Sequence, residues 1–132
     1  MRTDEDIKTS IMGYIRSSGL MDEATGTLTI RSRPLGSREE DVVVSVKSNN
    51  GGQRQIAYVN VHIYVLADDV GRQYEEPTGR CRVLCRKAAD ILDSFFPGDG
   101  SHCTLESQRV YKADGTEFYL INNEIKYIVI NE

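Results

Sequence analysis

The clearest pattern in the chain is an alternation of side chains between positions 54 and 67. Every odd position from 57 to 67 is apolar, whereas the even positions mix aromatic, polar and aliphatic residues. Successive side chains of a strand point to opposite faces, so the alternation predicts a long strand over 54–67 with its odd face on a core. The even face is too apolar to be only solvated, and we expect it to contact a partner. The contact residues expected there are Ile56, Tyr58, His62, Tyr64 and Leu66.

Two further segments carry apolar residues at helical spacing. The first predicts a helix over 4–18, because Thr3 is a good N-cap, acidic residues fill the first turn and Gly19 is a natural end. The second predicts a helix over 79–96, ended by Pro97. The apolar positions are Ile7, Ile11, Tyr14 and Ile15 in the first helix and Cys81, Leu84, Cys85, Ala88, Ile91, Leu92 and Phe95 in the second.

Turn residues separate the remaining strands. Asn and Gly at 48–52 predict a hairpin turn that joins a strand over 42–47 to the long strand, because both residue types tolerate positive φ. A polar loop follows the long strand and ends near Pro77. The other predicted strands cover 26–31, 104–111 and 118–130, with a tight turn at 113–116 between the last two. The order α-β-β-β-α-β-β favours one α+β domain over 1–132, with a mainly antiparallel sheet of four to five strands and two helices packed on one face.

The segment 32–41 contains Pro34, Gly36 and a run of charged residues. This composition predicts an exposed, mobile loop. Together with the even face of the long strand, we expect this loop to make contacts, through Arg33, Leu35 and Arg38.

Composition narrows the class of protein. The chain has 132 residues, of which 39% are hydrophobic and 27% charged, as in a soluble globular domain. Its net charge of −4 argues against tight nucleic-acid binding through a basic face. The acidic N-terminus is unlike a signal peptide, and no apolar run reaches the length of a membrane span. Three cysteines exclude a complete internal set of disulfides and favour reduced thiols in the cytoplasm.

The cysteines and histidines offer two chemical hypotheses. Cys81 and Cys85 lie at i and i+4 on one helix face, and His102 and Cys103 follow, so a Cys3His zinc site is conceivable. The spacing matches no standard zinc module, and burial as small hydrophobic side chains is the favoured interpretation. His102 and Cys103 point to opposite faces of a strand, which argues against a catalytic pair. His62 has no identifiable catalytic partner in the sequence.

Acidic pairs at Asp68-Asp69 and Glu75-Glu76 could bind a cation, although a solvated loop is the simpler interpretation. Basic residues on the second helix, including Arg80, are flanked by acids, and this balance indicates a solvated face or a subunit contact. We therefore expect no catalytic residues, no metal and no cofactor, and a protein that is not an enzyme.

The order of elements resembles that of the tail-completion and tail-terminator (head–tail joining) proteins of tailed phages and prophages. The resemblance lies in a hairpin with a long second strand (DVVVSVKSNNGGQRQIAYVNVHIYVLAD), a helix (RCRVLCRKAADILDSF) and two closing strands (KADGTEFYLINNEIKYIVI). It implies a structural adaptor, commonly a hexameric ring, at the head–tail junction or the end of the tail tube. The implied partners are copies of itself and phage head–tail or tail-tube proteins, in the virion or in the cytoplasm of a host that carries the prophage. A ring that passes DNA should not bind phosphates tightly, which suits the negative charge.

A small non-enzymatic α+β module that binds a protein or a ligand would share all of these features. The oligomeric state distinguishes the two hypotheses.

Overall fold

The computed structural model describes residues 1–51, 54–71 and 73–129. Over these residues the chain forms three helices and eight strands. The helices are α1 (Asp4–Ser18), α2 (Leu20–Glu23) and α3 (Thr78–Leu92). The strands are β1 (Leu28–Thr29), β2 (Val42–Asn50), β3 (Ile56–Leu66), β4 (Asp68–Val70), β5 (Gln73–Glu75), β6 (Ser94–Phe95), β7 (Ser101–Lys112) and β8 (Phe118–Val129).

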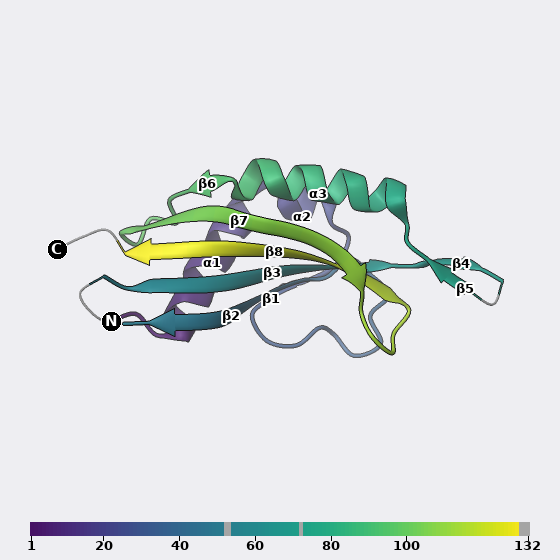
Figure 1. The fold of residues 1–132 in the computed structure, drawn as a ribbon, viewed down its shortest axis with the longest axis horizontal. Coiled ribbons are helices and arrows are strands. Elements are labelled where there is room, and N and C mark those ends of the chain that lie inside the picture. The colour runs from purple at the N-terminus through teal and green to yellow at the C-terminus, as the bar shows by residue number, and fades with distance from the viewer. Residues whose placement is uncertain (52–53, 72, 130–132) are drawn as a thin grey trace.

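Six of the strands form one sheet in the order β1-β2-β3-β8-β7-β6 (Figure 1). β1 pairs with β2 in parallel, and the other neighbours are antiparallel. The α+β class is confirmed, but the expected antiparallel sheet of four to five strands is wrong in detail. The sheet is mixed and has six strands, because the two-residue strands β1 and β6 extend its edges.

The first helix follows the sequence prediction to the residue because its ends are set locally. The Thr3 hydroxyl accepts from the Asp6 backbone N–H at 3.1 Å, and the Asp6 carboxylate accepts from the Thr3 N–H at 2.9 Å. This reciprocal capping box satisfies two N–H groups that lack helical partners. Gly19 ends the helix with φ 91°, in the left-handed region that favours glycine.

The third helix ends at Leu92, four residues before the predicted end. The residues that follow pair with β7 as β6, and Phe95 lies opposite Cys103. The Phe95 ring stacks on Tyr14 of α1 with 4.0 Å between centroids. The end of α3 is thus set by contacts with distant residues, which helical spacing alone does not reveal.

The hydrophobic core lies between the sheet and the two long helices. α1 contributes Ile7, Ile11 and Ile15, all fully buried, and α1 and α2 lie behind the strands in Figure 1. The predicted odd face of the long strand is confirmed, because every odd position from 57 to 67 is buried. The core residues from α3 and β8 are Cys81, Leu84, Ala88, Leu92, Ile121, Ile125 and Tyr127.

One polar side chain within the core has a hydrogen-bond partner for both its nitrogen and its oxygen. Asn123 on β8 is fully buried. Its amide donates to the Val61 carbonyl at 3.1 Å and its oxygen accepts from Gln108 at 2.8 Å. Gln108 also donates to the Cys85 carbonyl at 3.0 Å, so this network ties α3 to the sheet.

Several predicted boundaries shift. The expected strand over 26–31 is reduced to β1, while β2 and β7 are longer than expected. The polar loop before Pro77 contains β4 and β5, which form a separate two-stranded ribbon. The predicted hairpin turn at 48–52 is wrong over 48–50, because these residues belong to β2 and pair with β3. Residue 52 of that turn and residue 130 of the last predicted strand lie outside the described residues.

Candidate interaction surface

The face of the sheet opposite the helices carries the even positions of β3, and we call it the open face. Cross-strand register extends it onto β8, where Ile56 lies opposite Ile128 and Tyr58 opposite Lys126. The β3 positions on this face are all half-buried. No helix crosses in front of these strands in Figure 1, so within the described chain this face carries no second layer.

The middle of the open face is polar. Lys47 on β2 forms an ion pair with Glu124 on β8 at 2.9 Å. The side-chain oxygens of Asn60 and Asn122 are shielded from solvent and have no hydrogen-bond partner within the described residues. Burial lowers the pKa of His62, and the Asn122 side chain opposite it on β8 partly offsets that effect. His62 is therefore a neutral member of a sheet face at pH 7.

The chain covers the Tyr64 end of the open face with its own loop. The guanidinium carbon of Arg33 lies 4.1 Å from the centroid of the Tyr64 ring and 4.2 Å from that of Phe118. The two rings meet edge to face, with 6.3 Å between centroids. Cation–π contacts of this kind hold the loop against the sheet. Arg33, expected to contact a partner, is already engaged within its own chain.

Asp41 fixes the end of the same loop. Its carboxylate is 1% exposed, accepts from the Thr27 backbone N–H at 2.8 Å and pairs with Arg33 Nε at 2.9 Å. Burial alone would raise the pKa of Asp41, but the hydrogen bonds from Ser37, Thr27 and Arg33 outweigh it and hold the pKa below its usual value. The loop expected to be mobile is thus bound to the body through a buried charge.

The remaining predicted loop residues are exposed. Leu35 is fully exposed. The Arg38 side chain is 63% exposed and forms an ion pair with Glu117 at 2.7 Å. Arg38 lies at an open hollow of about 900 Å³ between the 33–38 segment, the β7–β8 turn and β5. The hollow is lined by Arg33, Pro34, Gly36, Ser37, Arg38, Tyr74, Lys112, Gly115, Thr116, Glu117 and Phe118.

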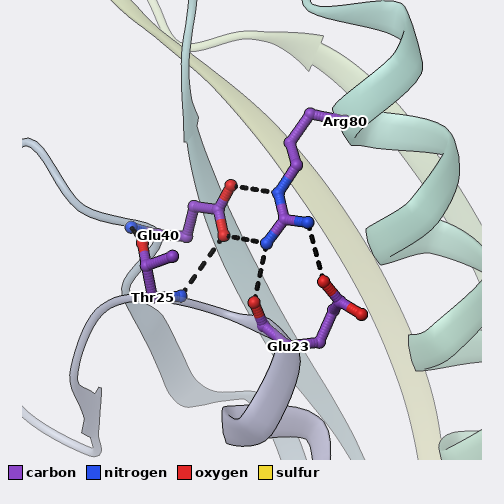
Figure 2. Close-up of polar contacts among 4 residues, drawn as sticks. All are labelled: Glu23, Thr25, Glu40 and Arg80. Atoms are coloured by element: carbon purple, nitrogen blue, oxygen red, sulfur yellow. Dashed lines mark hydrogen bonds and ion pairs between the residues drawn. The ribbon is translucent and has the colours of Figure 1, made fainter.

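A second ionic cluster holds the loop from the other side. Figure 2 shows Arg80 of α3 between Glu40 and Glu23. Arg80 donates to both carboxylate oxygens of Glu40 at 2.5 Å and to the Glu23 carboxylate at 2.8 Å. The hydrogen bonds to Glu40 are the main cause of the raised pKa of Arg80. The sequence indicated a solvated face or a subunit contact for Arg80, whereas the structure joins it to α2 and the loop.

The thiols lie in apolar surroundings. Burial raises the pKa of Cys81 to about 11 and that of Cys103 to about 12. Across the described chain, no three His, Cys, Asp or Glu side chains are grouped as metal ligands. The expected opposition of His102 and Cys103 is confirmed, because Cys103 is fully buried while His102 lies on the open face. His102 contacts the Ser94 hydroxyl at 2.8 Å and stacks on Phe96, with 4.5 Å between ring centroids.

Register brings in residues that the sequence did not single out. Ile128 lies between Ile56 and His102, so an aliphatic and aromatic row crosses β3, β8 and β7 and continues to Phe96, which is 64% exposed. The alternation in 118–130 could have revealed Ile128 if the strand pairing had been known. Phe96 follows the last strand residue of β6 and gave no signal by periodicity.

Comparisons with known proteins give no match, either to the models of protein families or to curated proteins. Across the described residues, no helix has both the length and the apolar character to cross a membrane. The resemblance to phage tail-completion proteins therefore stays a prediction.

Proposed function

We propose that the protein is a structural adaptor that assembles into a ring, as the resemblance to phage tail-completion and tail-terminator proteins implies. Its partners are then other copies of the chain and phage head–tail or tail-tube proteins. One observation carries the proposal: the open face keeps an aliphatic and aromatic row at half burial, with no second layer over it in the described chain.

The chemistry of this row, and of Tyr58 next to it on β3, suits a subunit contact. Ile56 and Ile128 give aliphatic surface, and Tyr58 adds an aromatic ring that has a polar end. Tyrosine and aliphatic groups are typical of interface cores, where the ring contributes a large area at a low cost in conformational entropy. The helices already cover the opposite face, so a neighbour that packs on the sheet has this face to use.

The test is a charge placed on the open face beside the row. Tyr58→Glu should leave the subunit folded, because Tyr58 lies outside the core, and should weaken association at least about 30-fold, as loss of an interface hot spot does. Tyr58 is a cleaner site than Tyr64, whose ring also supports Arg33. Sedimentation velocity and circular dichroism measure the two effects.

Val83→Glu is the matched control, because Val83 is an exposed apolar residue on α3, away from the open face. It should assemble like the wild type. Unchanged assembly of Tyr58→Glu would contradict the proposal. So would a wild-type protein that stays monomeric at high concentration and with every head–tail protein encoded beside it.

The hollow favours the second candidate, a small non-enzymatic α+β module that binds a ligand or a protein. Tyr74 and Phe118 offer ring surface there, beside the cations Arg33, Arg38 and Lys112. A monomer that binds a small anionic ligand, and loses it on Lys112→Glu, would support this alternative over the ring.

A further inference from the structure

The ribbon of β4 and β5, which we call the arm, extends away from the body of the molecule (Figure 1). Each of its six strand residues is exposed. A single two-stranded ribbon is at best marginally stable in water. The fold of the arm therefore gains from contact with something outside it.

The register of the arm places two negative charges face to face. Asp68 lies directly opposite Glu75. Like charges in this arrangement destabilise a strand pair, and the six ion pairs found among the described residues include neither of them. A cation close to this pair would relieve the repulsion.

The face of the arm that carries Asp68 and Glu75 is turned away from the chain's own hollow, whereas Asp69 shares the other face with Tyr74. Opposite residues in an antiparallel pair share a face, and neighbours along a strand alternate. Asp68 and Glu75 therefore share one face with Val70, while Tyr74 lies on the other face and lines the hollow. Because Tyr74 is part of its wall, the arm cannot also fill the hollow of its own chain.

The hollow is lined by more cations than carboxylates on a protein that is negative overall. Arg33, Arg38 and Lys112 line it, whereas the whole chain carries −4. Arg33 is paired with the buried Asp41, and Arg38 is paired with Glu117. Lys112 Nζ lies 6.0 Å from the Tyr74 ring centroid and takes part in none of the ion pairs of the described residues. Pro34 and Phe118 add apolar surface that an aliphatic side chain can contact.

We propose that the arm of one copy docks in the hollow of a second copy, with Asp68 and Glu75 near Lys112 and Arg38 and with Val70 against the apolar lining. Three residues per strand span about 10 Å, so Asp68, Glu75 and Val70 fit within one such hollow. The contact joins two different patches, and contacts of this type build closed rings or open filaments, according to the rotation that relates neighbouring copies. This inference rests on the proposed ring and names a contact that builds it.

Charge reversal tests the pairing. Lys112→Glu and Glu75→Lys should each weaken self-association roughly tenfold or more, since close charge pairs across interfaces couple by at least that factor. The chain that carries both changes should recover most of the loss. Association of the wild type should also weaken as sodium chloride rises from about 0.05 to about 0.5 M, because salt screens exposed charges.

A cross-link tests the geometry without relying on affinity. Two chains in a Cys85→Ser background, one with Val70→Cys and a size tag and one with Thr116→Cys, are mixed and treated with a short bismaleimide. The other two native thiols are buried. A cross-linked pair with the mass of one tagged and one untagged chain is expected. Val83→Cys in place of Thr116→Cys should give none.

The outcomes separate this contact from the ring itself. Rings that form normally in both single charge variants and yield no Val70–Thr116 cross-link would overturn the arm contact and leave the proposed function standing. A protein that stays monomeric and yields no cross-link would overturn both. Weakening by each single change without recovery in the double variant would also overturn the pairing of these two charges.

Discussion

Val61 on β3 gives a quantitative test of which face of the strand is the core. It is fully buried, and the core cluster around it contains no cationic side chain. In Val61→Asp the loss of apolar burial costs about 2 kcal/mol. The buried carboxyl must also become neutral, and at pH 7 this costs about 4 kcal/mol, because the ordinary pKa of Asp lies about 3 units lower and each unit is worth about 1.4 kcal/mol. The total is about 6 kcal/mol, against a typical stability of about 5–15 kcal/mol.

His62→Asp is the matched control, because it places the same charge one residue away on the open face. We expect it to cost less than about 2 kcal/mol, in the usual range for sites outside the core. Val61→Ala should cost about 2 kcal/mol through two lost methyl groups and a small cavity, and it keeps the comparison measurable if Val61→Asp does not fold.

Urea denaturation followed by far-ultraviolet circular dichroism measures all three variants. Val61→Asp should fail to fold or unfold at much lower urea than His62→Asp. The reverse order would refute the reasoning, because a slip of one residue in the strand register exchanges the two faces.

Three further changes test the polar contacts. Hydrogen bonds from Ser101 and Tyr127 outweigh burial and lower the pKa of Asp99. The charged Asp99 therefore stabilises the fold above about pH 4, and this contribution is lost as the pH falls further. The melting temperatures of wild type and Asp99→Asn should converge in acid. Arg80→Lys keeps the charge but loses the two-pronged contact with Glu40, and should lower stability by about 1–2 kcal/mol in urea titrations. Gly26→Ala should lower the melting temperature, because its Cβ would lie 2.6 Å from the Glu40 backbone.

Local signals in the sequence account for the parts of the fold that were predicted well. The alternation over 54–67 reports the two faces of β3, and Thr3 and Gly19 mark the ends of α1 without reference to other elements. β1 is shorter than the strand predicted over 26–31, and β6 was predicted as helix. Two residues carry no periodicity, and both strands exist through their partners on β2 and β7.

The candidate surface was predicted only where a local signal in the sequence reports it. The even positions of β3 lie outside the core, as the alternation indicates. Polar residues with Pro34 and Gly36 are typical of a free loop, and they gave no sign that Arg33 reaches Tyr64 and Asp41. That contact joins side chains from three places in the chain and depends on the completed fold. The pairing of β4 with β5 was likewise hidden by acidic residues typical of a loop.

The pairing of β3 with β8 has a consequence for how the protein folds. β2–β3 and β7–β8 each join strands that are neighbours along the chain, whereas Ile56 pairs with Ile128 across most of the second half of the sequence. The central pairing of β3 with β8 therefore joins the residues that are farthest apart in the sequence. Forming it costs more chain entropy than forming either hairpin, because a longer loop must close. High contact order of this kind slows folding. We expect the two hairpins to form early and their union along β3 and β8 to limit the rate.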